Sequence, residues 1–374
     1  MTKLYYHWIN RPTAGEFRTG VSLHGHTSRS NENLAFLPGV IEGTMFLPSV
    51  MRWAEKHHRR KWHEEFDYSR GYWNSPVLPE QAYDLEAKQI ADEGLEPLVS
   101  LTDHDAVAAC AELRAKDRPV PTSLEWTAPY KTAVFHIGLH NIPQEHADGL
   151  LKALRDYTAK PDPATLRDIL KHTHGMPDAL IVLNHPLSDQ GRIGFEIHVS
   201  MVDDFLSNFG DFIHALELNA LQPWDMNRRV AAIGTRVRLP LISGGDRHGF
   251  EPNGAINLTN ATTFADFAHE IRDKKSALLF MPQTKESLRY RYAENVRMIM
   301  DYYPNLGPQA AWFSRIFYQC PDGVVRTFGE LVGRRYRALD ITTLALGFFS
   351  SAVDQIVRPV APIFSGSDKQ KVIG

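Results

Sequence analysis

The chain has 374 residues, a formal net charge of −3 and 43% hydrophobic residues, which is enough to fill one large core and leave an appendage. This charge gives no overall basic field and argues against nucleic acid as a partner. The only cysteines are Cys110 and Cys320, so we expect no disulfide framework and a reducing compartment. No run reaches the roughly 18 apolar residues of a membrane span, and Met1–His7 lacks the apolar core of a signal peptide. We therefore expect a cytoplasmic protein.

Between residues 20 and about 285, short apolar runs alternate with segments of helical periodicity, a pattern typical of repeated βα units. The strands predicted from these runs are Gly20–Leu23, Glu96–Leu101, Ala133–Leu139, Ala179–Leu183, Ala215–Leu218 and Leu239–Ile242. The helices predicted between them include Ala106–Lys116, Glu145–Thr158, Pro163–His174 and Thr263–Lys274. Thr263 is a plausible helix cap.

Two regions lie outside this alternation. Residues 33 to about 95 are too long for an ordinary βα connection, and we interpret Met51–Tyr72 as a helical insertion near the mouth of a site. Residues 286–374 contain the helix-like segments Glu286–Tyr303, Gln309–Tyr318 and Phe328–Val357. The predicted organisation is therefore one barrel over 1–285, with an insertion at 33–95, followed by an α-helical region of unknown role over 286–374.

An ordered series of histidine and acidic residues follows the predicted strands. Its members are His24, His26, His104, Glu125, His136, His185, Asp246 and His248. In a β-strand, residues two apart point to the same face, so His24 and His26, and again Asp246 and His248, can converge on one centre. Imidazole and carboxylate are the ligands that Zn, Mn and Fe accept. The series therefore predicts a metal centre at the carboxyl ends of the strands, where barrels of this kind place their chemistry.

The residues in these blocks, and the order of the blocks along the chain, resemble those of the PHP (polymerase and histidinol phosphatase) family. The matching stretches are Val21–Thr27, Leu101–Ala108, Leu124–Thr127, His136–Gly138, Val182–Pro186, Ala215–Asn219 and Ser243–Gly249. The resemblance spans roughly residues 20 to 255. It implies a distorted (β/α)7 barrel with two or three divalent metals, zinc, manganese or iron, and a phosphoesterase activity of the kind found in many members.

The same resemblance implies three sets of ligands. The first set would be His24, His26, Glu125 and Asp246; the second would share Glu125 and add His136 and His185; the third would combine His104 and His248 with an acidic or histidine ligand, here nearest Glu32. Glu125 would then be the carboxylate that bridges two metals. Zinc, manganese and iron all fit such ligands, so the sequence leaves the metal open.

Other polar residues near these blocks have candidate roles. Asp103 would point away from His104 in a regular strand, and we expect it to orient an imidazole N–H. Asp105 is either a helix cap or a functional acid. A phosphate would also need a guanidinium, for which Arg192 is favoured over Arg29 and over Arg247, whose expected role is structural.

These features predict a metal-dependent hydrolase. A hydroxide on the metals would attack the phosphorus of a phosphate ester of a small molecule or nucleotide in line, without a covalent enzyme intermediate. The alternatives are a metal-dependent amide or ring hydrolase, a nuclease or proofreading module, and a metal-binding regulator without activity. The sequence names neither the substrate nor the oligomeric state.

Overall fold

The computed structural model describes residues 2–30, 32–34, 47–73, 75–286, 291 and 316–332. These residues fall into two compact units. Residues 2–30, 77–286 and 291 belong to the first unit, and residues 32–34, 47–73, 75–76 and 316–332 belong to the second. The first unit contains all the predicted metal ligands except Glu32.

The first unit contains two five-stranded sheets. One sheet has the order β1-β12-β11-β2-β5, with β1 over Lys3–Tyr6, β12 over Ala277–Phe280, β11 over Ala255–Thr259, β2 over Thr19–Ser22 and β5 over Glu96–Val99. The pairs β1–β12 and β2–β5 are parallel, whereas β11 runs antiparallel to both of its neighbours.

The other sheet has the order β10-β9-β8-β7-β6. Its strands are β10 over Leu241–Gly244, β9 over Ala215–Asn219, β8 over Leu180–Asn184, β7 over Ala133–His140 and β6 over Leu124–Tyr130. The strands β8, β9 and β10 are mutually parallel, and β7 is antiparallel to β6 and β8. The left-handed backbone of Lys131, with a φ of 52°, makes the tight turn between β6 and β7.

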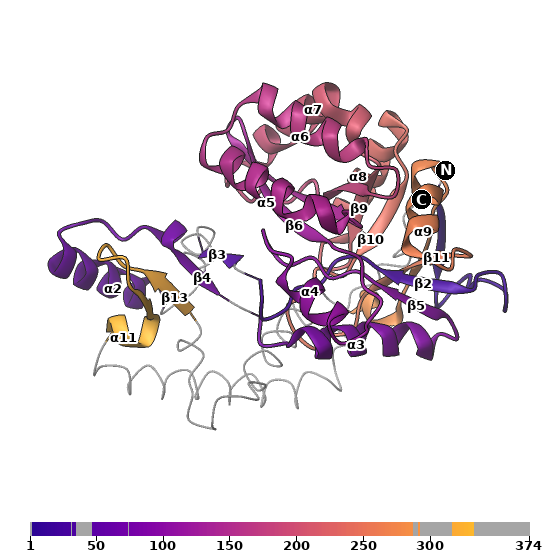
Figure 1. The fold of residues 1–374 in the computed structure, drawn as a ribbon, viewed down its shortest axis with the longest axis horizontal. Helices are drawn as coiled ribbons and strands as arrows, with labels where there is room; N and C mark the ends of the chain where they lie inside the picture. The colour runs from indigo at the N-terminus through magenta and orange to yellow at the C-terminus, as the bar shows by residue number, and fades with distance from the viewer. Residues whose placement is uncertain are drawn as a thin grey trace. The chain divides into compact units, whose positions relative to one another are not determined.

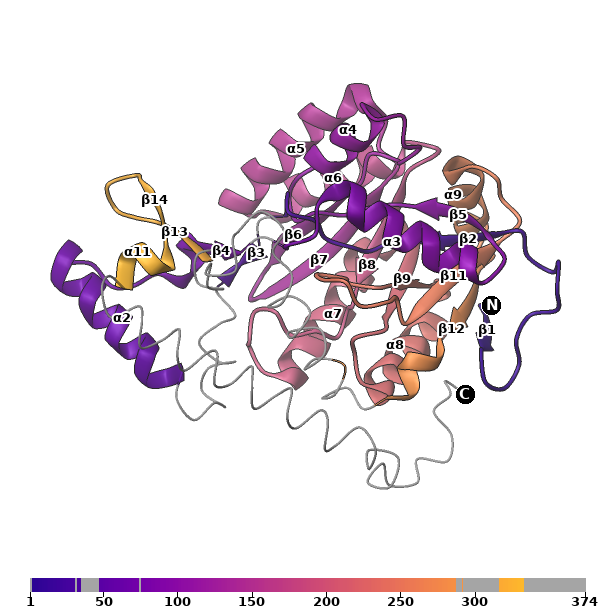
Figure 2. The same cartoon turned by 90° about the horizontal axis from the view of Figure 1, so that it is seen from below.

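Helices cover these sheets (Figure 1). They are α3 over Pro79–Asp92, α4 over Ala108–Arg114, α5 over Gln144–Ala159, α6 over Pro163–His174, α7 over Phe195–Phe209, α8 over Trp224–Val237 and α9 over Phe264–Arg272, with 3-10 turns at Gly210–Phe212 and Pro282–Lys285. Helix α3 packs on β2 and β5, as Figure 2 also shows, while α5, α6 and α8 pack on β6, β8 and β9.

Alternation along the second sheet separates an apolar face from a polar one. On β6, Leu124 and Trp126 enter the larger hydrophobic core, so Glu125 between them points to the opposite face. On β9, Leu216 and Leu218 enter the same core, which leaves Glu217 on the face shared with Glu125. Residues that line the polar face are therefore fixed by the apolar residues on either side of them.

The two sheets meet at isolated contacts rather than continuous ladders. Single parallel bridges pair Gly25 with Arg247 and His104 with Glu125. Beside the first bridge, the amide of Asn257 on β11 donates to the carbonyls of Val21 and Ser243, and its oxygen accepts from the amide N–H of Ser243. The side chain of Asn257 thus replaces the missing ladder between β2 and β10.

The predicted fold class is confirmed only as mixed α/β. All six predicted strands are present, and helix α6 has the predicted bounds. Within the described residues, however, the ladders form two open sheets and no closed (β/α)7 barrel. The regular βα repeat is interrupted at β6, β7 and β8. Strands β6 and β7 are joined by a tight turn without a crossover helix, and β7 runs antiparallel to β8 although α5 and α6 lie between them in the sequence.

The second unit contains a four-stranded sheet of the order β14-β13-β4-β3. Strand β3 spans Glu32–Asn33, β4 Gly71–Trp73, β13 Ile316–Gln319 and β14 Val325–Thr327, and they accompany α2 over Leu47–Trp62, a 3-10 turn at Tyr68–Arg70 and α11 over Phe328–Val332. The helix predicted over Met51–Tyr72 is thus confirmed as far as Trp62, whereas residues 71 and 72 belong to β4; its place near the mouth of a site stays a prediction.

The helix predicted over Gln309–Tyr318 is wrong at its described end. Residues 316–318 pair with β4, where Phe317 lies opposite Tyr72 and their rings stack 5.3 Å apart. Cross-strand aromatic pairing outweighs a helical pattern here. The predicted start of a helix at Phe328 coincides with α11. Residues 309–315 and 333–357, and all of 286–303 except 286 and 291, lie outside the described residues.

Candidate metal centre

Six histidines and two carboxylates from separate segments converge in the first unit. His24 and His26 follow β2, His104 follows β5, Glu125 lies on β6, His136 lies on β7, His185 follows β8, and Asp246 and His248 follow β10. Their ligand atoms form several overlapping groups in which three atoms lie within 4.8 Å of one another. The predicted convergence is therefore present.

Glu125 is at the middle of the centre and is fully buried. Its Oε2 atom lies 3.1 Å from His24 Nε2, 3.3 Å from His26 Nε2 and 3.4 Å from His104 Nε2. Its Oε1 atom lies 3.4 Å from His136 Nδ1 and 3.3 Å from His185 Nε2. The two oxygens of one carboxylate thus face two different sets of imidazoles.

The first predicted ligand set has the spacing of a single ion's coordination shell. His24 Nε2 and His26 Nε2 are 3.1 Å apart, and they lie 3.6 and 3.5 Å from Asp246 Oδ1. Together with Glu125 Oε2, these atoms stand near the separation of about 3.3 Å expected for ligands bound at ~2.0–2.1 Å to one tetrahedral ion. Two facing imidazole nitrogens at this distance suit an ion between them.

The other predicted sets are less complete. His136 and His185 share Oε1 of Glu125, and His185 Nε2 lies 4.0 Å from Asp246 Oδ2. The group that contains His104 and His248 also includes His26, which belongs to the first set. Glu32 pairs with Trp73 in β3 of the second unit, and its side chain lies outside the described residues. Its ligand role stays a prediction.

Carboxylate and amide groups orient the ligands. Glu217 Oε1 accepts from His24 Nδ1 at 2.7 Å, so that His24 Nε2 faces the centre, and Glu217 Oε2 accepts from the His185 amide at 2.7 Å. Asn184 donates to Glu125 Oε1 at 2.9 Å, and Asn219 donates to Asp246 Oδ2 at 3.1 Å. Such partners fix the geometry of metal ligands.

Gly244 makes room for this arrangement. A Cβ atom at this position would collide with the carboxylate of Glu217 and with the side chain of His24. The glycine thus allows a close approach of the backbone at the end of β10. Asp246, two residues later, has a left-handed φ of 48°, so the regular strand assumed for Asp246 and His248 is wrong even though both side chains reach the centre.

The two aspartates beside His104 have partners other than those predicted. Asp103 accepts from the amide and hydroxyl of Thr27 at 2.6 and 2.8 Å. It therefore secures the loop that carries His26 and does not orient an imidazole through these bonds. Asp105 accepts from the amide of Thr127, whereas α4 begins after Val107, so the predicted helix cap is wrong.

The charged groups of the centre stabilise one another. Burial raises the pKa of Glu125, but the neighbouring His24, His136 and His104 outweigh it and hold the pKa well below the ordinary value. For Asp246, burial is likewise outweighed, chiefly by His24. Burial lowers the pKa of His24, but Glu125 and Glu217 raise it well above the usual value. Metal binding at such a centre competes with protons for the imidazole nitrogens.

The donors fit a divalent transition metal. Among the described residues, Glu125 Oε2 and His136 Nδ1 are buried without a hydrogen-bond partner. Leaving a buried polar atom unsatisfied costs about 1–3 kcal/mol, and cations held by the first and second predicted ligand sets would satisfy Glu125 Oε2 and His136 Nδ1 respectively. The centre is therefore a group of histidine and carboxylate side chains that could hold metal, with the identity and number of ions left to experiment.

The three candidate arginines have different surroundings. Arg29 forms an exposed pair with Glu112, with nitrogen–oxygen distances of 3.0 and 2.8 Å. Arg247 is buried beside Glu86, in agreement with its predicted structural role. Arg192 is exposed and has a left-handed φ of 52°, in a loop where Asp189 accepts from the amide of Gly194. The phosphate role favoured for Arg192 stays a prediction.

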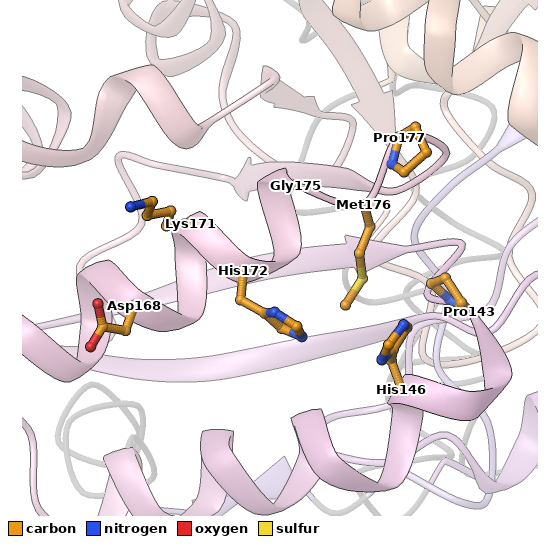
Figure 3. Close-up of a pocket in the computed structure, with 8 residues that line it drawn as sticks. All are labelled: Pro143, His146, Asp168, Lys171, His172, Gly175, Met176 and Pro177. Atoms are coloured by element: carbon orange, nitrogen blue, oxygen red, sulfur yellow. The ribbon is translucent and has the colours of Figure 1, made fainter.

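A surface hollow of about 510 Å³ lies elsewhere, between α5 and α6. Figure 3 shows His146, His172 and Met176 on its wall. None of the ligands described above lines it. Because five of the eight ligands are buried and the other three, His136, Asp246 and His248, are only partly exposed, the centre is identified by its donors rather than by an open pocket.

Sequence reasoning missed Glu217, Asn184 and Asn219, although all three lie within the stretches that carry the family resemblance. A signal was present: in Ala215–Asn219, strict alternation with Leu216 and Leu218 puts Glu217 and Asn219 on the polar face. His140 on β7 is also buried, with Nδ1 3.0 Å from the hydroxyl of Ser100.

No family model and no curated protein matches this chain. Among solved structures, a candidate metal-dependent phosphoesterase from Bifidobacterium adolescentis is 18% identical, with a TM-score of 0.33 and coverage of 54% of this chain and 92% of its own. PsfC from Pseudomonas syringae is 16% identical, with a TM-score of 0.40, and the match covers 57% of this chain and 87% of PsfC. An amidohydrolase from Chromobacterium violaceum is 15% identical, with a TM-score of 0.35; its structure holds sulfate and no metal. The match covers 61% of this chain and 87% of the amidohydrolase. At these TM-scores the structural likeness carries no argument, and the candidate metal centre rests on the side chains described above.

No helix in the described part of the chain is long and apolar enough to cross a membrane.

Proposed function

We propose that the protein is a metal-dependent hydrolase that cleaves a phosphate ester of a small molecule or nucleotide. The observation that carries the proposal is the position of Glu125, whose two oxygens face separate groups of imidazoles. A buried carboxylate in this position suits a bridge between two cations. We also propose that the two sheets, joined through Asn257 and the two bridges, are an open variant of the (β/α)7 barrel.

The proposed ligand sets are those predicted from the sequence. His24, His26, Glu125 and Asp246 would hold one ion, Glu125 with His136 and His185 a second, and His104 and His248 would contribute to a third. Zinc, manganese or iron ions, when bound, lower the pKa of water and neutralise charge on ester oxygens. Phosphate esters suit such a centre because their charge is spread over several oxygens.

The protein's own residues would hold and orient the reacting groups. Glu217 keeps Nε2 of His24 directed into the centre, and Asn184 keeps the carboxylate of Glu125 in its bridging orientation. Asp103 holds the loop of His26 through Thr27. Arg192 would pair with the phosphate oxygens of the substrate, because a guanidinium matches their geometry.

A parallel assay tests the reaction class. Protein stripped of metal and reconstituted separately with Zn²⁺, Mn²⁺ and Fe²⁺ is offered p-nitrophenyl phosphate, bis-p-nitrophenyl phosphate and a p-nitroanilide. We expect metal-dependent release of nitrophenol and none of nitroaniline. Release of nitroaniline alone would replace the phosphoesterase by an amide hydrolase. Metal-replete protein that is inactive on all three, and on a panel of phosphorylated metabolites, would contradict the proposal.

A further inference from the structure

A buried ion pair adjoins the segment that carries Asp246 and His248. Arg247 is 2% exposed and Glu86 is 1% exposed, and Arg247 Nε lies 3.1 Å from Glu86 Oε1. Glu86 belongs to α3, far from Arg247 in the sequence. A buried pair of this kind needs an explanation, because burial of two charges is costly and an apolar pair of similar volume is often as stable.

Arg247 is the residue between two predicted metal ligands. Asp246 precedes it and His248 follows it, while its own side chain is directed at α3. A second residue of α3 contacts the same guanidinium, since Arg247 Nη2 lies 3.4 Å from Gln89 Oε1. One turn of helix α3 therefore holds this guanidinium at two points.

The backbone of Arg247 connects the two ligand loops. Its carbonyl accepts from the amide of His26 at 2.7 Å, and it forms an isolated bridge with Gly25. A displacement of Arg247 would therefore move Asp246 and His248, and it would also disturb the loop that carries His26.

Asn253, also in the segment after β10, adds further contacts to α3. Asn253 donates from its amide N–H to Gln89 Oε1 at 2.7 Å and accepts at its carbonyl from Gln89 Nε2 at 2.7 Å. The side chain of Asn253 donates to Glu86 and, at 3.0 Å, to Ser22 on β2. The ion pair is thus one part of a buried network that ties α3 to the segment after β10.

We propose that Arg247 is a positioning residue of the metal centre. Its ion pair with Glu86 and its contact with Gln89 fix the turn that presents Asp246 and His248, so the ion affinity of the centre depends on a helix that contributes no ligand. The inference rests on the proposed function, because it requires that the centre binds metal. It assigns no contact with substrate to Arg247.

The test measures zinc affinity by competition with a chromophoric chelator, on the full chain, and needs no substrate. Arg247→Met removes the charge and nearly preserves the length of the side chain, and Glu86→Gln removes the partner's charge. We expect zinc affinity to fall about 10- to 100-fold in both variants, the range for groups that orient metal ligands. The double variant should be no weaker than Arg247→Met, because the two residues act together.

The matched control is Arg272→Met. Arg272 on α9 donates to the carbonyls of His174, Met176 and Ala179, so its loss should lower the unfolding temperature without changing zinc affinity. Arg247→Lys keeps the charge, should recover part of the affinity, and serves if Arg247→Met does not fold.

The outcomes separate the inference from the proposed function. Unchanged affinity in Arg247→Met or, if that variant does not fold, in Glu86→Gln, would overturn the positioning role alone. An equal loss of affinity in Arg272→Met would do the same, since the effect would then reflect stability. Wild-type protein that binds none of zinc, manganese and iron would overturn the proposed function, and this inference with it.

Discussion

Glu125→Gln changes the residue on which the proposed mechanism depends. The substitution removes one negative charge and leaves the shape of the side chain nearly unchanged. A glutamine oxygen can still accept the bond from Asn184, so the fold should be retained. The remaining amide nitrogen would face the imidazoles that now surround Oε2, and it offers them neither charge nor a lone pair.

The magnitude follows from how many groups share this carboxylate. Five imidazole nitrogens lie within 3.1 to 3.4 Å of its two oxygens, so a single substitution weakens both proposed ion positions. We expect hydrolytic turnover to fall at least ~100-fold, which corresponds to about 2.7 kcal/mol of lost transition-state stabilisation. One of the two ions should also be retained more weakly.

The assay compares turnover and metal content in the same preparations. Initial rates on the best phosphate ester are measured for wild type and for Glu125→Gln at saturating metal, together with elemental analysis and circular dichroism. Glu64→Gln is the control, because Glu64 is 55% exposed and 3.6 Å from Arg70 in the second unit. Full metal occupancy with normal turnover in Glu125→Gln would refute the bridging role.

Three further outcomes are expected. Glu217→Gln should weaken zinc binding about 10- to 100-fold by loosening His24, and unchanged affinity in a chelator competition would exclude its orienting role. Arg192→Ala should raise KM for phosphate esters about tenfold with little change in kcat, whereas an unchanged KM would remove Arg192 from the site. Burial, and to a smaller extent Arg272, lowers the pKa of His214 from 6.5 to about 3. The stability that depends on a neutral His214 is fully present above pH 6.5. It is lost at about 1.4 kcal/mol per pH unit as the pH falls towards 3. Urea unfolding between pH 7 and pH 4 should therefore show a shallower loss in His214→Gln, and equal slopes would contradict this assignment.

Apolar runs with clear ends predicted the strands well. Ala179–Leu183 is buried on both faces in the structure, as a continuous apolar run of this length suggests. Strands β1, β6, β11 and β12 of the first unit were not predicted. In β6, Pro129 near the end of the strand weakens the pattern. It is tolerated because β6 is at the edge of its sheet. The sheet over residues 316–319 depended on pairing with residues 71–73, a distant contact that local periodicity does not contain.

The metal centre was predictable as a set of donors but only partly as a geometry. His24 and His26 converge as expected, and so does Glu125 between them and His185. The prediction for Asp246 assumed a regular strand, whereas its left-handed backbone directs the carboxylate inward. Orientation of this kind is set by packing between segments, and a single sequence gives no direct sign of it.

The same limit applies to the residues that orient the ligands. Asp103 was expected to hold an imidazole, yet its oxygens bind Thr27, because the loop after β2 folds back over the end of β5. Glu217 holds His24 across the sheets, and its role depends on Gly244 leaving space for the carboxylate. Alternation could have placed Glu217 on the correct face, but not its partner.

Elemental analysis of the purified protein tests the central claim most directly. Protein prepared without chelator, and again after reconstitution with zinc, manganese or iron, is analysed for metal per chain. The donors around Glu125 predict at least two ions per chain, with a loss of bound metal when His24 and His26 are both replaced by alanine. Fewer than one ion per chain after reconstitution would contradict the metal centre.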